Sequence, residues 1–199
     1  MALAVRKATY GDSDPLLRHL IRAFDDDPAA NYLIRQDAKR SRGFYLLFHI
    51  CLCTLSLPHD EVYIAANAAG GALWIPPQTP PISMGKQFAM LPRMLRVTGL
   101  GGIKRMLTAL ERLDKAQPKQ MHYYLQILGV DPDMQGKGLG SALIQPVLAR
   151  CDEEGWGAYL ENSRQENIAF YERHGFTVTE QIHLGPDGPL IWCMWRDPQ

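Results

Sequence analysis

The most restrictive feature of the sequence is a glycine-rich segment between a strand-like run and a helix-like run. Aromatic and branched side chains dominate residues 122–130, which predicts a β-strand, whereas residues 138–153 have helical periodicity. Glycine occupies every second position at Gly136, Gly138 and Gly140. Glycine lets backbone N–H groups approach a ligand, and the first turn of a helix adds unsatisfied donors and a positive dipole end. The segment therefore predicts a cradle for a diphosphate group, with a lysine at its rim.

Two well-known phosphate-binding motifs do not fit this loop. A nucleoside-triphosphate P-loop continues from Gly-Lys to Ser or Thr, but Gly138 follows Lys137 here. A dinucleotide-binding G-x-G-x-x-G motif requires a third glycine where Ser141 or Leu143 stands. Two interpretations of the loop remain, a diphosphate cradle that follows neither motif and a tight turn that binds no ligand.

The order of the surrounding segments predicts an α/β fold with a mixed sheet. Strand-like runs at residues 122–130 and 157–160 flank the helical segment 138–153, which is typical of parallel strands joined by a right-handed crossover. Runs at residues 61–66 and 72–75 are joined by a turn-rich link and predict an antiparallel hairpin.

A length of 199 residues suits one domain, so we expect a single domain over residues 1–199. A helical insertion is expected at about residues 84–117, broken by glycines at 99–102. The polar stretch between the first two helices is expected to be an exposed loop. The other expected elements are a strand at 4–9, helices at about 13–24, 38–55 and 165–173, and strands at 176–182 and 190–195.

The charge and hydropathy give no reason to expect a nucleic acid or a membrane as partner. Lys plus Arg and Asp plus Glu both number 21, so the formal net charge is zero. The most apolar stretch, Phe44–Leu57, is too short for a bilayer span and contains His49. No apolar run near the N-terminus leads to a cleavage site, so we expect a cytoplasmic protein.

The cysteines show neither a disulfide framework nor a zinc-finger spacing, so we expect buried thiols and no metal site. They are Cys51, Cys53, Cys151 and Cys193.

Two blocks in the C-terminal half resemble the GNAT superfamily of N-acetyltransferases. The segment Gln135–Gly140 matches that superfamily's Gln/Arg-x-x-Gly-x-Gly/Ala signature. The segment Asn167–Phe176 looks like its second block, in which an Asn precedes Tyr-Glu-x-x-Gly-Phe. Within the superfamily, three stretches are similar to the puromycin N-acetyltransferase group, namely Gln135–Ser141, Phe170–Thr179 and Trp192–Met194.

The resemblance implies a fold and a reaction. The fold would be α/β (α+β), with a mixed, mostly antiparallel sheet of six to seven strands, a central splayed parallel pair and helices on both faces. The cofactor would be acetyl-coenzyme A, whose acetyl group would move to a primary amine of a small molecule by direct attack in a ternary complex.

The resemblance also implies which residues bind the cofactor. Val130, just after a strand bulge at Gly129, would offer its backbone N–H to the thioester carbonyl, and Asn167 would contact the pantetheine arm. Tyr171 would face the sulfur. The cofactor-binding residues implied in this way are Leu128, Gly129, Val130, Gln135, Gly136, Lys137, Gly138, Leu139, Gly140, Ser141, Asn167, Phe170 and Tyr171.

Two residues are expected to transfer protons. The resemblance implies that Tyr171 gives a proton to the departing thiolate, since a phenol with a pKa of about 10 is protonated at neutral pH; the alternative is a core aromatic. An ammonium must lose a proton before it attacks. Our first candidate base is Glu161, because parallel strands open a cleft at their carboxyl ends, and the alternative is a solvated charge. His122 and Tyr124 are second candidates, with core packing as the alternative.

The acceptor amine is expected to meet the acidic cluster Asp25–Asp27 and nearby aromatic residues. Carboxylates attract a cationic amine, although a solvated cluster that ends a helix is the alternative. For the aromatic residues the alternative is core packing. The candidate substrate residues are Asp27, Tyr32, Trp74, His122 and Tyr124.

Alternative functions are a peptide or protein N-acetyltransferase and a sensor that binds acyl-coenzyme A without turnover. A monomer or a homodimer is expected.

Overall fold

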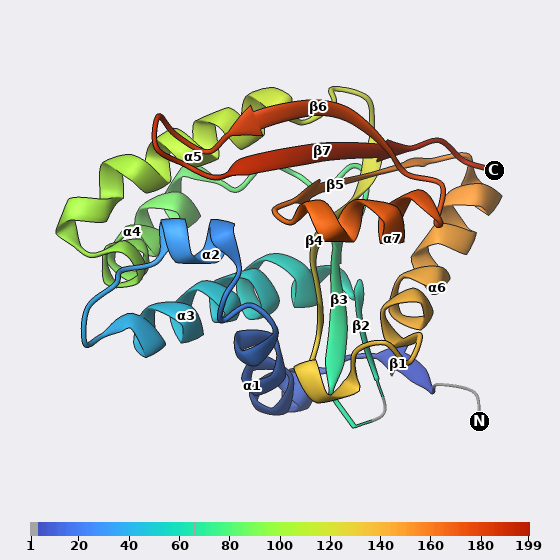
Figure 1. Ribbon diagram of the computed structural model, residues 1–199, viewed down its shortest axis with the longest axis horizontal. Coiled ribbons are helices and arrows are strands. Elements are labelled where there is room, and N and C mark those ends of the chain that lie inside the picture. The colour runs from blue at the N-terminus through green and yellow to red at the C-terminus, as the bar shows by residue number, and fades with distance from the viewer. Residues whose placement is uncertain (1–3, 66) are drawn as a thin grey trace.

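A mixed sheet of seven strands runs through the computed structural model, which describes residues 4–65 and 67–199 (Figure 1). The strands are arranged in the order β1-β2-β3-β4-β5-β7-β6. Among the described strands, only β4 and β5 pair in parallel. The bounds are β1 (Val5–Lys7), β2 (Val62–Ala65), β3 (Gly70–Ile75), β4 (His122–Val130), β5 (Gly157–Asn162), β6 (Thr177–His183) and β7 (Leu190–Arg196). The expected mixed, mostly antiparallel sheet is confirmed.

The α-helices are α1 (Ser13–Ala23), α2 (Pro28–Leu33), α3 (Arg40–His49), α4 (Met84–Thr98), α5 (Ile103–Ala116), α6 (Leu139–Glu154) and α7 (Ile168–Glu172). A π-helical segment, Ile50–Ser56, continues α3. Short 3₁₀ turns occupy Tyr10–Asp12, Leu57–His59, Leu100–Gly102, Pro132–Met134 and Gln165–Asn167.

Two buried cores lie on opposite faces of the sheet. On β2, Tyr63 and Ala65 belong to one core and Val62 and Ile64 to the other, as the alternation of side chains along a strand requires. Helix α6 covers the first core, and α1 and α3 cover the second. Figure 1 shows α6 on one side of the sheet and α1 and α3 on the other, so the expected helices on both faces are confirmed.

One extra residue in β4 interrupts its pairing with β3. The adjacent residues Leu73 and Trp74 pair with Ile127 and Leu125, so Gln126 has no partner of its own. This arrangement is a β-bulge, which bends the strand and re-aims its side chains.

The bulge changes the face on which the following side chains lie. Tyr123 and Leu125 pack in the α6 core before the bulge, and Leu128 and Val130 pack against the same core after it. The expectation of a bulge at Gly129 is wrong, because that residue pairs in regular register with β3.

The parallel pair separates at the bulge. Pairing between β4 and β5 runs from His122 with Gly157 to Leu125 with Leu160. Beyond this point β4 stays with β3, whereas β5 continues to Asn162 along β7. The two central strands therefore diverge at their carboxyl ends, as expected for a splayed pair.

The stretch between α1 and α3 is not the exposed polar loop that the sequence suggests. It contains α2, which Asp27 caps by accepting a 2.8 Å hydrogen bond from the Ala30 N–H, with Pro28 in the first turn. Asp27 is 5% exposed and Ile34 is fully buried. The Asp-Pro pair starts a helix here, in addition to following one.

The helices expected at about 84–117 are α4 and α5, which are separated at Gly99–Gly102. The hairpin of β2 and β3 is confirmed up to Ala65, and the expected strand residue Ala66 lies outside the described residues. Within the described ranges, no helix combines the length and apolar character needed to cross a bilayer. All four cysteines are free thiols, and Cys151 and Cys193 are buried as expected, whereas Cys51 and Cys53 are only partly buried.

Candidate functional site

The separation of β4 and β5 opens a cleft of about 520 Å³ at their carboxyl ends. Its walls are formed by the bulged part of β4, the end of β5, the segment between α1 and α2, the 3₁₀ turn before α7, and Tyr171 of α7. The predicted site residues that line it are Asp27, Leu128, Gly129, Val130, Gln135, Glu161, Asn167 and Tyr171.

The glycine-rich loop next to the cleft has a backbone that suits an anion. Gly136 and Gly138 have φ angles of 73° and 79°, which side chains other than glycine rarely adopt. No side chain caps α6, whose first internal hydrogen bond runs from the Ala142 N–H to the Gly138 carbonyl over 3.1 Å. Within the described part of the chain, the N–H groups of residues 136–141 donate to no other group. These donors are available to a ligand.

The open space in front of Gly136 fits the same interpretation. A Cβ atom built there meets no atom within 4 Å, so the backbone is uncovered. Lys137 folds back on its own loop, where its Nζ donates 2.9 Å to the Asp133 carbonyl. Gln135 donates 3.1 Å to the Val130 carbonyl and so connects the loop to the end of β4. Free N–H donors, positive φ angles and an uncovered surface together fit a diphosphate.

The edge of β4 beyond the bulge faces the cleft. Among the described strands, β5 does not pair with β4 after Leu125, so the main chain on that side of residues 126–130 is without a strand partner. N–H and C=O groups alternate along such an edge and can bind an extended chain. Gly129 is required here for space, because a Cβ atom would lie 2.6 Å from Leu20 and 2.9 Å from Phe24.

Glu161 reaches the cleft from the end of β5. Its Oε2 accepts a 2.5 Å hydrogen bond from the Tyr124 hydroxyl. Burial raises the pKa of Glu161 to about 7, although the tyrosine hydroxyls beside it favour the charged form. A carboxylate with this pKa gains and loses a proton near neutral pH, which is what a general base requires.

The raised pKa of Glu161 makes the stability of the folded protein depend on pH. Below pH 4.5, the ordinary pKa, the group is protonated in both states, whereas between 4.5 and about 7 only the unfolded chain ionises. We therefore expect the free energy of unfolding of the wild type, relative to Glu161→Gln, to fall by about 3 kcal/mol as pH rises through this window. Urea unfolding of both proteins at a series of pH values measures it. A difference that stays constant with pH contradicts the prediction.

Tyr171 lies on the opposite wall, on α7. Its ring packs edge-on against Phe170 and Phe176, and the residue is 9% exposed. Burial, and then the nearby Asp27 carboxylate, raise the pKa of Tyr171 above its ordinary value. The phenol is therefore protonated at neutral pH, and its hydroxyl forms no hydrogen bond within the described residues.

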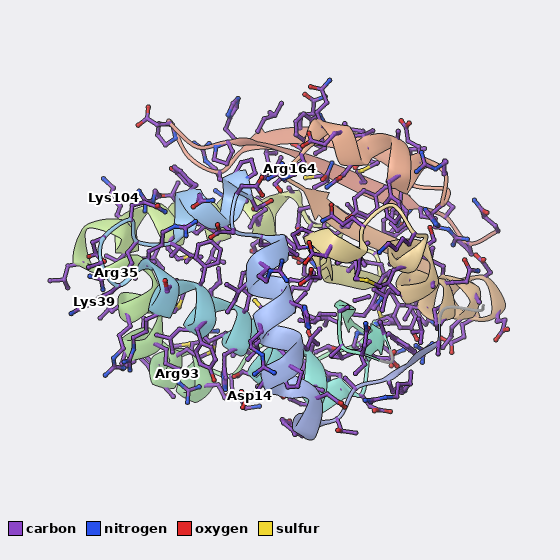
Figure 2. All side chains as sticks on the ribbon, turned by 60° about the horizontal axis from the view of Figure 1, so that its bottom comes forward. Asp14, Arg35, Lys39, Arg93, Lys104 and Arg164 are labelled. Atoms are coloured by element: carbon purple, nitrogen blue, oxygen red, sulfur yellow. The ribbon has the colours of Figure 1, made fainter. Side chains whose placement is uncertain are left out.

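Two contacts that sequence reasoning missed join the walls of the cleft. The Ser163 hydroxyl donates to an Asp27 carboxylate oxygen, and the Arg164 guanidinium donates 2.8 Å to the Asp26 carbonyl. Figure 2 shows Arg164 beside the N-terminal helices, although it follows β5 in the chain. Because the partners are separated by more than 130 residues, no local sequence pattern could indicate these contacts.

The remaining predicted residues do not line the cleft. Trp74 is fully buried in the α6 core, so it packs there rather than forming a substrate wall. Tyr32 packs on the turn between β6 and β7, where its hydroxyl lies 2.2 Å from a Cβ position built at Gly185. His122 stacks edge-on against Tyr159 and Trp195 at the opposite end of β4.

Two further predicted site residues contact other site residues but do not line the cleft. Phe170 covers the first turn of α6, because a Cβ atom at Gly140 would lie 3.3 Å from its ring. Tyr124 contacts Glu161 but does not line the cleft. Within the described residues, no group of three or more His, Cys, Asp or Glu side chains could hold a metal ion.

Residues 103–178 match the sequence model of a family described as an acetyltransferase (GNAT) domain. An uncharacterised N-acetyltransferase from Schizosaccharomyces pombe is 38% identical over 79 residues, which are 39% of this chain and 32% of that protein. The chain thus spans about a third of that relative's length.

Solved structures share the fold over the whole chain. A structure described as histone acetyltransferase HPA2 and related acetyltransferase, from Corynebacterium glutamicum, has a TM-score of 0.75 at 24% identity and covers 100% of this chain and 98% of its own. Arylalkylamine N-acetyltransferase 2 from Aedes aegypti has a TM-score of 0.70 at 18% identity, with 100% of both chains covered. The architecture of this protein is therefore the GNAT fold.

Proposed function

We propose that this chain, which has the GNAT acetyltransferase fold, is an acetyl-coenzyme A-dependent N-acetyltransferase that acts on a primary amine of a small molecule. The observation that carries the proposal is the placement of Glu161 and Tyr171 in one cleft that adjoins a loop of free N–H donors. We further propose that residues 1–199 act as one domain, in which α4 and α5 are an insertion.

The residues present fit the cofactor. The N–H groups of residues 136–141 would bind the diphosphate, with Lys137 at the rim. The exposed edge of β4 from Leu128 to Val130, together with Asn167, would bind the extended pantetheine arm. Acetyl-coenzyme A bound there supplies an activated acetyl thioester, so a nucleophilic residue on the protein is not needed.

Glu161 and Tyr171 divide the proton transfers between them. Glu161 takes a proton from the acceptor ammonium, which frees the nitrogen lone pair for attack on the thioester carbon. Tyr171 would give its phenolic proton to the coenzyme A sulfur as the carbon–sulfur bond breaks. The second proton that the acceptor nitrogen loses on forming the amide would return to Tyr171, and Glu161 would release the first proton to solvent. Direct attack in a ternary complex requires both partners in the cleft at once, which its walls on β4, β5 and α7 allow.

The charges in the cleft favour a cationic acceptor. Asp27 and Glu161 both line it, and their negative potential attracts an ammonium and disfavours an acceptor with a carboxylate beside its amine. The similarity of three short stretches to the puromycin N-acetyltransferase group supports the inclusion of puromycin among the amines tested.

A coenzyme A release assay against a panel of amines tests the proposed function. The panel contains arylalkylamines, agmatine, polyamines, puromycin, amino acids and short peptides. We expect turnover with at least one small cationic amine and none with the amino acids. Turnover with peptides alone would replace the proposal with peptide acetylation, and saturable acetyl-coenzyme A binding without any turnover would indicate a sensor.

A pair of glycine variants tests the proposed diphosphate cradle. Gly136 and Gly155 have φ angles of 73° and 74°, and a Cβ atom at either meets nothing within 4 Å. Substitution by alanine at either position should therefore destabilise the folded protein by about 1 kcal/mol through backbone strain. Only Gly136→Ala places a methyl group in front of the free N–H groups. Calorimetric titration should therefore show that the affinity of Gly136→Ala for acetyl-coenzyme A is about tenfold lower than that of the wild type. The affinity of Gly155→Ala should stay within about twofold of the wild type. Equal affinities for the two variants contradict the assignment.

A further inference from the structure

Tyr124 lies beside the proposed base and outside the cleft. Its hydroxyl donates a 2.5 Å hydrogen bond to Glu161 Oε2, from the neighbouring strand. Tyr124 pairs with Tyr159, and the next pair along the two strands is the last before they separate. Side chains on one face of a strand recur at every second residue, so Glu161 lies on the same face as Tyr159 and extends one step beyond the paired region. The main chain of Glu161 pairs with Cys193 on β7, so on the β4 side the hydrogen bond from Tyr124 is the contact that holds the Glu161 side chain.

The other titratable groups around Glu161 and Tyr124 are neutral over the working pH range. Burial raises the pKa of Tyr159, and it raises the pKa of Cys193 on β7 to about 11 and that of Cys51 in the π-helical segment to about 12. The pKa of Tyr124 is raised well above its ordinary value, first by burial and then by the Glu161 carboxylate. Within the described residues, no cation forms an ion pair with Glu161.

The two tyrosines near Glu161 are not equivalent. Both hydroxyls lie close enough to Glu161 to favour its charged form, Tyr124 more strongly. The Tyr159 hydroxyl makes no hydrogen bond of normal geometry among the described residues, whereas the Tyr124 hydroxyl donates to Glu161. A short hydrogen bond from a neutral phenol stabilises the charged form of a carboxylate. Tyr124 is therefore the group with the geometry to control both the orientation and the proton affinity of Glu161.

We propose that Tyr124 is a positioning residue for Glu161, an inference that rests on the proposed function: by holding Oε2, Tyr124 leaves Oε1 for the acceptor ammonium. In the reaction, the proton moves from the ammonium nitrogen to the Glu161 carboxylate, and Tyr124 keeps its own proton throughout. Tyr124 touches neither acetyl-coenzyme A nor the acceptor in this role.

A titration of Glu161 tests the proposal without any need for turnover. Full-length protein labelled with ¹³C at the glutamate carboxyl carbons is titrated by NMR, and the Glu161 signal is assigned by its loss in Glu161→Gln. Tyr124→Phe removes one oxygen atom and with it the donor to the charged form, so the midpoint of Glu161 should move to higher pH. A midpoint equal to that of the wild type overturns the proposal.

The adjacent Tyr123 provides a matched control. Its hydroxyl donates 3.1 Å to Glu154 Oε2, and its side chain packs in the α6 core on the opposite face of β4. Tyr123→Phe loses the same oxygen atom from the same strand, and its Glu161 midpoint should equal that of the wild type.

A pH profile of kcat/KM gives the second readout. Tyr124→Phe should lose about tenfold at pH 6.5 and recover to within about threefold of wild type at pH 9, because the base is then deprotonated in both proteins. A merely structural role lowers kcat/KM equally at all pH values and overturns the proposal. If the NMR midpoint moves but the wild type acetylates no amine, the positioning role stands and the proposed function fails. If the wild type is active and the pH profile of Tyr124→Phe superimposes on that of the wild type, the proposed function stands and the positioning role fails.

Discussion

Glu161→Gln is expected to lower kcat at pH 7.5 by about 10²- to 10³-fold, with the affinity for acetyl-coenzyme A unchanged within about twofold. Glutamine has nearly the same shape as glutamate but does not accept the proton that the ammonium must lose. Glu161 contributes no group to the loop of residues 136–141, which we propose to bind the diphosphate, so cofactor binding should persist. Steady-state assays of coenzyme A release and calorimetric titration measure the two quantities.

The pH dependence of kcat/KM also distinguishes Glu161→Gln from the wild type. Glu161 acts as a base only when ionised, and its pKa is about 7, so wild-type kcat/KM should rise with pH up to that value beyond the increase due to the amine's own ionisation. Glu161→Gln retains only the amine's contribution, since both proteins use the same acceptor.

Glu166 is the matched control for this substitution. It also lines the cleft, but it is exposed and its pKa is held below its ordinary value, first by a backbone hydrogen bond and then by Arg164. Glu166→Gln should keep kcat within about threefold of wild type. Equal losses in the two variants would mean that negative charge in the cleft, and not a base at Glu161, is what the reaction needs.

Tyr171→Phe is expected to lower kcat by about 10²-fold while acetyl-coenzyme A binds as in the wild type. The phenol contributes its proton only as the sulfur leaves, so its loss affects the chemical step and not cofactor binding. Because burial raises the pKa of Tyr171, the wild type should show no loss of rate from Tyr171 ionisation up to pH 10. Single-turnover and steady-state rates check this prediction.

A second buried tyrosine distinguishes catalysis from packing. The Tyr63 hydroxyl lies 3.3 Å from Arg150 and does not line the cleft. Tyr63→Phe should retain kcat within about twofold. Turnover by Tyr171→Phe equal to that of Tyr63→Phe would remove the acid role from Tyr171.

The parts of the fold that sequence predicted well are those set by local pattern. The glycines at 136 and 138 are needed for positive φ angles, and alternation and turn residues marked β4, β5 and the β2–β3 hairpin. Glu161 was a candidate because it ends a parallel strand, and the structure places it in the cleft. Its role as a base remains a prediction.

The parts that were missed depend on partners distant in the chain. Asp27 was expected in an exposed loop because three adjacent carboxylates suggest solvation, but helix capping and the Ser163 hydroxyl satisfy it when buried. Trp74 lies in a β-strand, and only the tertiary structure determines that its face is covered by α6 and not by substrate. The bulge at Gln126 has no local signature, since it arises from the register between two strands.

The bulge has a consequence for how this chain can vary in length. Upstream of Gln126 the odd-numbered side chains of β4 pack towards α6, and downstream the even-numbered ones do. Deleting that single residue would restore uniform alternation and leave Leu128 and Val130 on the α6 side and Ile127 on the other side. If Gln126 instead took a regular place in the pairing with β3, the side chains of these three residues would all change face. The bulge therefore lets β4 contain one residue more than a regular strand without exchanging its two hydrophobic layers.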